Sequence, residues 1–480
     1  MELFRNLIAG QWVDASDGAT FPDTNPANPA ETIGIFPSAT SQDVRRAIDA
    51  ARAALPGWAG TPSPARGEIL DRASRIVDQR LDEFAAALTR EEGKTLAESR
   101  AEVARARDIF HYYGGEGWRL GGDVLPSSTS GELLYTRREP LGLVSIITPW
   151  NFPIAIPAWK IAPALVCGNV VLFKPASYAP RVALMLVESL VEAGLPSGVI
   201  SFITGSGSAV GDEMVANEHV NGVSFTGSHA VGVGVYGKAI KNMARVQLEL
   251  GGKNPMVVLA DADLDLAVGL AMKGGFGLTG QACTATSRVI VEDPVAEEFV
   301  LALARQAKAL VVGDGLDSRT QMGPAVSQEQ METDLRYVRL GQEEGAKLVT
   351  GGGLAGEDGF YVQPTVFDHV DPAMSIAQEE IFGPVVSVIR ARDFDDALAK
   401  ANAVSYGLTA GVVTNDLKKA FSFANRVEAG VVKINEPTTG LALQAPFGGF
   451  KQSSANTFKE QGRAAAEFYT RLKTVYVGHG

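Results

Sequence analysis

From Leu143 onward, short apolar runs that predict buried strands alternate with longer amphipathic segments that predict helices. The first series of expected strands covers 143–147, 170–173, 199–203, 223–225 and 246–250. Alternation of this kind is typical of a parallel sheet with helices on both faces. Ligands bind such sheets beyond the carboxyl ends of the strands, so the polar and glycine-rich residues after each strand form the candidate site.

A second series of expected strands begins near Pro255 and predicts another domain of the same type. Its strands are expected at 255–259, 289–291, 385–388 and 431–434. Two further strand patterns, 132–137 and 474–477, have no neighbouring strand in the sequence. Strands left over in this way often pair with each other or with a partner chain. We therefore predict an α/β fold with two doubly wound, Rossmann-like domains and a small β flap that mediates oligomerisation.

The N-terminal region is expected to form scaffold. A short hairpin is predicted at 7–13, and amphipathic helices are predicted at 43–55, 69–88 and 96–113. The Pro-Gly pair at 56–57 predicts the end of the first helix.

Composition excludes several classes of function. The 480 residues carry a formal net charge of −12 and contain no dense run of Lys and Arg, which argues against nucleic-acid binding. Two cysteines cannot form a disulfide framework and favour a reducing compartment. The first ten residues lack the pattern of a signal peptide, and no apolar stretch is long enough to cross a membrane. We expect a cytoplasmic protein with small-molecule partners and no bound metal.

Cys283 lies in the sequence Gly-Gln-Ala-Cys-Thr, shortly after the glycine-rich run 274–277. A nucleophilic thiol needs space for a substrate and a backbone that can approach it closely, which glycine permits. Lone cysteines are also common in protein cores, where they act as small apolar residues. Its own surroundings leave both roles open for Cys283, and the other cysteine, Cys167, has no motif around it.

Two glycine-rich turns follow predicted strands. The segment 204–211 has the spacing GxGxxxG, one residue longer than the dinucleotide-binding fingerprint, and it suits a structural turn equally well. The segment 225–228, Phe-Thr-Gly-Ser, opens a helical segment whose N-terminus could hold a pyrophosphate. Lys174 ends its own strand before a proline, where its ammonium group could lie near the adenosine side of a bound dinucleotide.

Three polar side chains have positions that suit catalysis. Asn151 is flanked by Pro149 and Pro153, so its amide could be held rigidly to stabilise an oxyanion, although it could equally cap a turn. Glu249 ends an apolar strand, where burial would raise its pKa and suit a general base, unless it forms an ion pair within the protein. Glu380 likewise precedes a tight turn.

Together these motifs occur in the order seen in the aldehyde dehydrogenase superfamily, which the chain resembles over essentially its whole length. In chain order they are TPWNFP around Asn151, KPAS from Lys174, FTGS at 225–228, LELGGKNP around Glu249, GQACT around Cys283, EEIFGP around Glu380 and PFGG at 446–449. The resemblance implies a three-part architecture. It assigns 1–121 and 141–248 to a cofactor-binding domain, 249–445 to a catalytic domain, and 122–140 and 446–480 to the oligomerisation element of a homodimer or homotetramer.

The resemblance also implies a reaction. Cys283 would attack an aldehyde as a thiolate, and Asn151, together with the backbone N–H of Cys283, would stabilise the oxyanion. Collapse of this thiohemiacetal would send a hydride to the nicotinamide. Water activated by Glu249 would then hydrolyse the thioester. A relative that transfers the acyl group to coenzyme A would not need this base, so the presence of Glu249 favours hydrolytic release.

A nicotinamide dinucleotide is the implied cofactor. Lys174 would contact the adenosine ribose, Gly227 and Ser228 the pyrophosphate, and Glu380 the ribose of the nicotinamide. Further cofactor contacts are expected at Ile147, Trp150, Gly207, Gly211, Phe225, Leu250 and Phe382.

Ser177 departs from the pattern of many family members, which have Glu three residues after the lysine that corresponds to Lys174. A carboxylate there can bind the 2′-hydroxyl of the adenosine ribose and would repel a 2′-phosphate, whereas a serine hydroxyl can hydrogen-bond the phosphate. We therefore favour NADP as the cofactor, with NAD still usable.

Three segments resemble the 2-oxoglutarate semialdehyde (2,5-dioxovalerate) dehydrogenases, with succinate semialdehyde dehydrogenases and broad-specificity enzymes as alternatives. They are 361–364, 376–380 and 443–454. The implied substrate, 2-oxoglutarate semialdehyde, carries a carboxylate that an Arg or Lys would bind. Arg288, five residues after Cys283, is one candidate. Many members with neutral substrates also carry this arginine, which favours a structural role for it.

A cysteine hydrolase is the alternative from a different class of enzyme. It would usually pair its thiol with a histidine. None of the five histidines lies in a comparable motif; they are His111, His219, His229, His369 and His479. A non-catalytic member of the superfamily would be expected to lack Cys283 or Glu249, and both are present.

Overall fold

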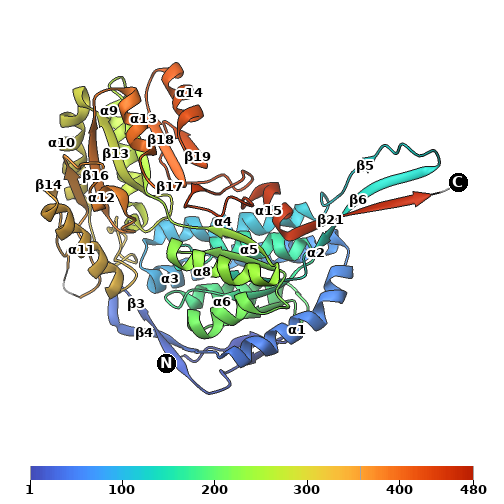
Figure 1. The fold of residues 1–480 in the computed structure, drawn as a ribbon. Helices are drawn as coiled ribbons and strands as arrows, with labels where there is room; N and C mark the ends of the chain where they lie inside the picture. The colour runs from blue at the N-terminus through green and yellow to red at the C-terminus, as the bar shows by residue number, and fades with distance from the viewer. Residues whose placement is uncertain (1, 357, 479–480) are drawn as a thin grey trace.

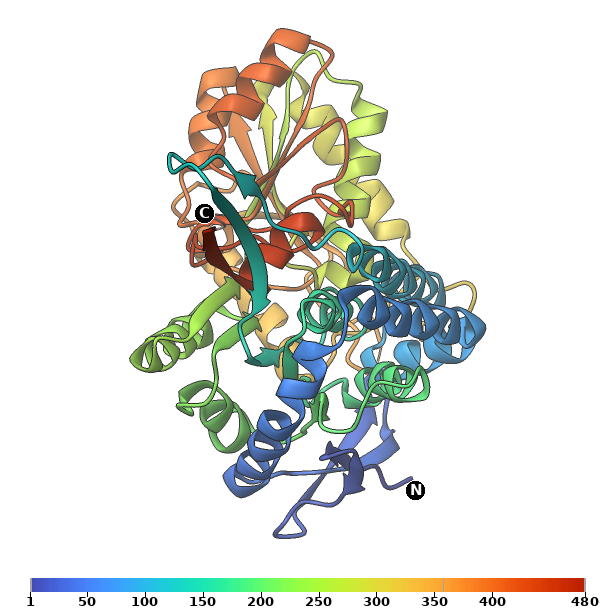
Figure 2. The same cartoon turned by 90° about the vertical axis from the view of Figure 1, so that its right-hand side faces the viewer.

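The computed structural model describes residues 2–356 and 358–478, which form two α/β domains and a small projecting sheet (Figure 1, Figure 2). The first domain contains a seven-stranded sheet in the order β11-β10-β7-β8-β9-β1-β2. Its strands are β1 (Asn6–Ile8), β2 (Gln11–Val13), β7 (Leu143–Ile147), β8 (Val170–Lys174), β9 (Ile200–Phe202), β10 (Gly222–Thr226) and β11 (Arg245–Glu249). The strands β7 to β11 are parallel, and β1 and β2 form the predicted N-terminal hairpin.

The order of the parallel strands creates a switch point between β7 and β10. From β7 the chain adds β8 and β9 on one side, and it then crosses over to add β10 and β11 on the other side. In parallel sheets, ligands bind in the crevice expected at such a switch point, beyond the carboxyl ends of the two central strands.

Eight helices of the described chain belong to the first domain. They are α1 (Ser41–Gly60), α2 (Ser63–Gln79), α3 (Leu81–Glu92), α4 (Leu96–Glu116), α5 (Ala155–Val166), α6 (Pro180–Glu192), α7 (Asp212–Ala216) and α8 (His229–Ala239). Reciprocal capping boxes begin α1 at Thr40 and α4 at Thr95. The predicted end of α1 was wrong: the helix passes through Pro56, and the buried Trp58 extends its apolar face. The pattern over 69–88 is divided between α2 and α3 at Arg80.

The second domain contains a seven-stranded sheet in the order β14-β15-β16-β13-β12-β18-β19, with six parallel strands and the antiparallel β14. Its strands are β12 (Asn254–Val258), β13 (Thr286–Glu292), β14 (Lys347–Thr350), β15 (Thr365–Asp368), β16 (Val385–Ala391), β18 (Thr409–Val413) and β19 (Val431–Ile434). Its helices are α9 (Leu264–Phe276), α10 (Asp293–Ala309), α11 (Gln328–Glu343), α12 (Ser375–Gln378), α13 (Phe394–Asn402) and α14 (Leu417–Arg426). Two separate apolar clusters contain buried residues from this sheet and its helices.

Several shorter elements connect the domains. The strands β3 (Thr20–Asn25) and β4 (Asn28–Pro37) form a hairpin, and β17 (Tyr406–Gly407) pairs with β20 (Phe450–Lys451). The last helix, α15 (Gly462–Tyr469), contributes buried residues to the apolar core of the first domain. No helix within 2–356 and 358–478 is both long enough and apolar enough to span a membrane.

The third sheet projects away from both domains (Figure 1). It consists of β5 (Val124–Leu125), β6 (Glu132–Pro140) and β21 (Thr470–Gly478), in the order β21-β6-β5. The two strand patterns without sequence neighbours therefore pair with each other, with Thr474 opposite Thr136. Residues 470–478 join this sheet, whereas Phe468 and Tyr469 are buried in the core of the first domain. The division into functional domains and the oligomerising role of the flap stay predictions.

We expect charges on the flap to weaken the predicted assembly. Leu472 and Tyr476 of β21 are 58% and 65% exposed in the single chain, and a partner subunit would cover them. The pair Leu472→Asp and Tyr476→Asp would place unpaired charges in that interface, so the mass of the assembly should fall at least about twofold in light-scattering measurements. The control Leu301→Asp, on the exposed face of α10, should retain the wild-type mass. A wild-type monomer, or a double variant of unchanged mass, would contradict the prediction.

Candidate active site

The crevice at the carboxyl edge of the first sheet gathers residues that the sequence predicted for the site. Cross-strand register places Lys174, Ile147 and Phe225 next to one another on neighbouring strands. At the end of β11, the carbonyl oxygen of Glu249 accepts a hydrogen bond from the N–H of Gly227 at 3.1 Å. Residues from four strands thus meet at one edge, because the carboxyl ends of parallel strands point the same way.

Asn151 is almost fully buried and is held from two sides. Its side-chain Nδ2 donates to the carbonyl oxygen of Gln281 at 3.0 Å, which ties it to the loop of Cys283. Its own carbonyl oxygen accepts a hydrogen bond from Nζ of Lys94 at 2.6 Å. Lys94 also forms a buried ion pair with Glu102 at 2.7 Å, and Glu102 accepts hydrogen bonds from N–H groups at the start of α5. The second N–H of the Asn151 amide remains to stabilise an oxyanion.

Cys283 borders a cavity of about 330 Å³. The backbone before it packs closely, because a Cβ at Gly280 (φ +69°) would lie 2.3 Å from the carbonyl oxygen of Gly383. Nδ2 of Asn254 donates to the carbonyl oxygen of Cys283 at 2.8 Å. Burial, and then the charges of nearby carboxylates, raise the pKa of the Cys283 thiol to about 12. Cys283 is half-buried at the edge of this cavity, so its sulfur is placed to react with a molecule there.

Glu249 is buried, and neither of its carboxylate oxygens makes a hydrogen bond of normal geometry within the described residues. Burial, and then the charge of Glu460, raise the pKa of Glu249 well above its ordinary value. Glu460 is itself held by an ion pair with Lys160 and by the indole N–H of Trp159 at 2.8 Å. A Cβ at Gly448 would lie 2.6 Å from Oε1 of Glu249, so only glycine fits there. Burial makes the ionised form of Glu249 a stronger base than an exposed carboxylate, which suits the predicted role of general base.

Glu380 packs against the backbone that follows Glu249. Its Oε1 accepts a hydrogen bond from the N–H of Gly252 at 2.9 Å. A Cβ at Gly251 would lie 2.0 Å from Oε2, so glycine permits this approach. Burial raises the pKa of Glu380 to about 7. The ring of Phe382 lies 5.4 Å from that of Trp150 in an edge-to-face arrangement, which brings the two predicted aromatic contacts together.

The groups predicted to bind the adenosine end of a cofactor are accessible or lack a charged partner. Lys174 is buried, burial lowers its pKa to about 8, and its Nζ donates to the carbonyl oxygen of Pro175 at 3.2 Å. No ion pair involves Lys174 in the part of the chain that the structure describes. Ser177 is exposed. Ser228 precedes α8 without capping it, so backbone N–H groups at this helix start are available to an anion.

Gly207 and Gly211 lie in a single wide turn that leads into α7, with open space beside both Cα atoms. Ser206 caps this turn through a hydrogen bond from the N–H of Ala209 at 3.1 Å. Leu250 packs against α8, where a Cβ at Gly232 would lie 2.5 Å from Cδ2 of Leu250. Together with the free amide groups at α8, this chemistry fits a dinucleotide, while the individual cofactor contacts stay predictions.

Arg288 does not reach the cavity, so it is not free to bind a substrate carboxylate. Its guanidinium is buried and donates to the carbonyl oxygens of Lys253, Lys400 and Ala401 at 3.0, 3.1 and 3.0 Å. The structural role considered for it in the sequence is therefore the one observed. Arg288 lies on β13, which carries the chain from the Cys283 loop into the second domain, so its guanidinium is surrounded by carbonyl groups of that domain.

Sequence reasoning missed several charged residues around the site. Lys94 contacts Asn151, and Glu102, Arg105 and Lys273 line the cavity. Lys160 and Glu460 form an ion pair whose charges act on Glu249. The one signal available was the helical spacing of Glu98, Glu102 and Arg105, which puts these three on one face of α4. No motif connected that face with Cys283, so tertiary structure was needed.

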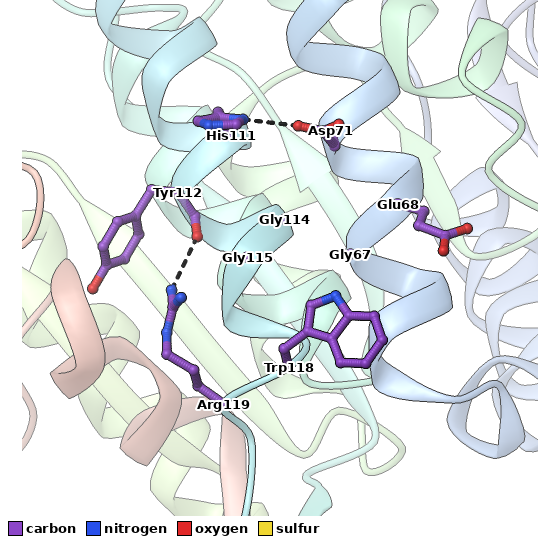
Figure 3. Close-up of a pocket in the computed structure, with 9 residues that line it drawn as sticks. All are labelled: Gly67, Glu68, Asp71, His111, Tyr112, Gly114, Gly115, Trp118 and Arg119. Atoms are coloured by element: carbon purple, nitrogen blue, oxygen red, sulfur yellow. Dashed lines mark hydrogen bonds and ion pairs between the residues drawn. The ribbon is translucent and has the colours of Figure 1, made fainter.

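A larger depression of about 570 Å³ lies between α2 and α4 (Figure 3). It is lined by Trp118 and by His111, whose Nδ1 lies 2.8 Å from Asp71. None of the site residues predicted from the sequence borders it. The smaller cavity is the candidate active site, because Cys283 borders it and Asn151 is hydrogen-bonded to the loop of Cys283.

Comparison with known proteins identifies the family of the chain. Residues 12–475 match the model of the Aldehyde dehydrogenase family. The chain belongs to the aldehyde dehydrogenase family. The alpha-ketoglutarate semialdehyde dehydrogenase of Haloferax volcanii is 51% identical to it over 476 residues, with 98% of each chain covered. The 2,5-dioxopentanoate dehydrogenase of Saccharolobus solfataricus is 47% identical over 474 residues, also with 98% of each chain covered.

A solved structure shows the same fold. Betaine aldehyde dehydrogenase from Staphylococcus aureus, in complex with NAD⁺, has a TM-score of 0.96 and 35% sequence identity, covering 99% of this chain and 95% of that chain. The predicted family and the predicted α/β architecture with two parallel sheets are confirmed, and the protein is an aldehyde dehydrogenase.

The raised pKa of Glu249 predicts a pH-dependent gain in stability when its charge is removed. Below the ordinary pKa of 4.5, Glu249 is protonated in both the folded and the unfolded chain, so its burial does not lower the free energy of unfolding. As the pH rises toward the higher pKa of the folded state, the unfolded chain loses this proton more readily, and the free energy of unfolding falls. We expect Glu249→Gln to raise the melting temperature by about 2 °C at pH 9 and by less at pH 5. Differential scanning calorimetry at both pH values measures this difference. The exposed control Glu68→Gln should show no such dependence, and an equal effect of Glu249→Gln at both pH values would contradict the burial argument.

Proposed function

We propose that this enzyme oxidises an aldehyde to a carboxylate through thiohemiacetal and thioester intermediates on Cys283, with NAD(P) as the oxidant. The observation that carries the proposal is the convergence of three groups. Cys283 borders the cavity, Asn151 is hydrogen-bonded to its loop, and the unbonded Glu249 is close enough for its charge to act on the thiol. These groups suffice for nucleophilic attack, oxyanion stabilisation and hydrolysis.

Residues of the chain perform or prepare each step. Once deprotonated, Sγ of Cys283 attacks the carbonyl carbon, and the free N–H of Asn151 and the N–H of Cys283 stabilise the oxyanion. A bound NAD(P)⁺, which Lys174, Ser228 and Glu380 would hold, would supply the hydride acceptor and a positive charge that offsets the carboxylates around the thiol. Glu249 then takes a proton from the water that attacks the thioester carbonyl, which releases the carboxylate product and frees the thiolate of Cys283.

The proposed substrate is 2-oxoglutarate semialdehyde, which is also called 2,5-dioxopentanoate. Two relatives named for this substrate are 51% and 47% identical to the chain over almost its full length. Succinate semialdehyde and a broad range of aldehydes are the alternatives within the family. A cysteine hydrolase is disfavoured because no histidine lines the Cys283 cavity among the residues that the structure describes.

The proposed cofactor is NADP, with NAD as a second cofactor. Ser177 is exposed and has no carboxylate that would repel a 2′-phosphate, and Lys174 ends the preceding strand. A solved relative binds NAD⁺, which supports a nicotinamide dinucleotide at this site.

The first test is a substrate panel followed through the reduced cofactor at 340 nm. Wild-type enzyme should oxidise 2-oxoglutarate semialdehyde and succinate semialdehyde at least about tenfold more efficiently than pentanal or benzaldehyde, because a bound carboxylate adds charge-assisted hydrogen bonds. Cys283→Ala should abolish turnover while retaining binding of the cofactor, measured by calorimetry. Equal efficiency with neutral aldehydes would reject the semialdehyde assignment, and persistent turnover in Cys283→Ala would reject the nucleophile.

A carboxylate at position 177 should shift the choice of cofactor toward NAD. In Ser177→Glu, the ratio of kcat/KM for NADP to that for NAD should fall about 10- to 100-fold, because the new charge repels a 2′-phosphate and can accept a hydrogen bond from a 2′-hydroxyl. Ser177→Gln is the matched uncharged control and should change the ratio much less. An unchanged ratio in Ser177→Glu would show that this position does not select the cofactor.

A further inference from the structure

The cavity beside Cys283 has walls from both domains. One wall comes from α4, α5 and the loop before α5, and the other comes from the end of α9, the loop 277–284 and the segment 439–441. Four charged side chains reach this cavity; they are Glu98, Glu102, Arg105 and Lys273. The partners of these four groups decide which charge the cavity offers to a substrate.

Both acidic side chains are already engaged. Glu98 accepts hydrogen bonds from the N–H of Thr95 at 3.0 Å and from the N–H of Leu278 at 2.7 Å, which joins α4 to the loop before Cys283. Glu102 is paired with the buried ammonium of Lys94. Neither carboxylate forms an ion pair with Arg105 or Lys273 among the described residues.

The two basic side chains form no ion pair within the described part of the chain. The guanidinium of Arg105 donates to two neutral acceptors, the carbonyl oxygen of Leu441 and, at 2.9 Å, Oε1 of Gln461. Asp108, whose charge acts on Arg105, is itself paired with Arg107. Because an arginine has five N–H donors, Arg105 is held in one orientation and still has donors to offer.

The position of Arg105 along the cavity suits the far end of a substrate. Glu102, on the same face of α4, contacts the start of α5 a few residues after Asn151, which marks the level of the oxyanion donor. Arg105 lies three residues, or about 4.5 Å, farther along the helix axis. Lys273 lies in the last turn of α9, close in sequence to Gly277, which also lines the cavity.

We propose that Arg105, assisted by Lys273, binds the distal carboxylate of the semialdehyde and selects carboxylated over neutral aldehydes. This inference rests on the proposed function and names the residues that give it its substrate class. A carboxylate accepts charge-assisted hydrogen bonds from a guanidinium that is already oriented, so little conformational entropy is lost on binding. A neutral aldehyde would leave both cations without a carboxylate partner.

The test compares two five-carbon aldehydes in the intact enzyme, 2-oxoglutarate semialdehyde and pentanal. In Arg105→Met, the ratio of their kcat/KM values should fall about 10- to 100-fold, because the apolar stem is retained while the donors are lost. Arg105→Lys should restore part of the ratio, since it keeps the charge. Arg100→Met is the matched control on the same helix, because Arg100 is paired with Asp82 outside the cavity, and it should keep the wild-type ratio.

A variant of Lys273 tests the same proposal without changing the hydrogen bonds of Arg105. Lys273 is exposed, so Lys273→Met should fold normally, lower the same ratio about two- to fivefold and weaken competitive inhibition by glutarate. If the wild-type enzyme prefers the semialdehyde but both variants keep its ratio, the inference is overturned while the proposed function stands. If both rates fall together in Arg105→Met with the ratio unchanged, Arg105 only positions Leu441 and Gln461. A wild-type enzyme without preference for the semialdehyde would overturn the proposed substrate itself.

Discussion

The geometry of the active site depends on the buried ammonium group of Lys94. It bonds the carbonyl oxygen of Asn151, pairs with Glu102 and lies 4.7 Å from the centre of the Phe152 ring. Removing one partner of such a buried pair costs about 3–5 kcal/mol, although the intact pair adds little to stability compared with apolar packing. Its importance therefore lies in orientation. It fixes the loop after β7 against α4 and α5, and that loop carries Asn151, the proposed oxyanion donor.

Desolvation raises the pKa values of the reactive groups that lie near Lys94 and Asn151. Glu249 and Glu460 are almost fully buried, and Cys283 and Glu380 are half-buried. Removal from water is the largest cause of the raised pKa values of Cys283, Glu249 and Glu380. Each negative charge in such a cluster disfavours the next, so the groups cannot all ionise freely at neutral pH. The raised pKa of the thiol is thus consistent with a nucleophile that needs its cofactor to become reactive.

Two arginines near the site show how neighbours decide the role of one residue type. Arg288 is close to Cys283 in sequence, yet its donors are used by three carbonyl oxygens in the second domain. Arg105 is distant in sequence, yet it borders the cavity with donors to spare. Carbonyl groups that satisfy a guanidinium make it structural, whereas an incomplete set of partners at a cavity makes it available for recognition.

The sequence by itself determined the two parallel sheets and the family, and it predicted Cys283, Glu249 and Asn151 as the reactive groups. These could be predicted because strand patterns, glycine-rich turns and the motifs around each residue are local in the chain. Tertiary structure alone decided which charges surround those groups. Lys94 reaches Asn151 across 57 positions, Asn151 reaches Gln281 across 130, and Trp159 reaches Glu460 across 301. Burial and pairing depend on such distant contacts, so the pKa of Cys283, the structural role of Arg288 and the availability of Arg105 follow from packing and not from any local pattern.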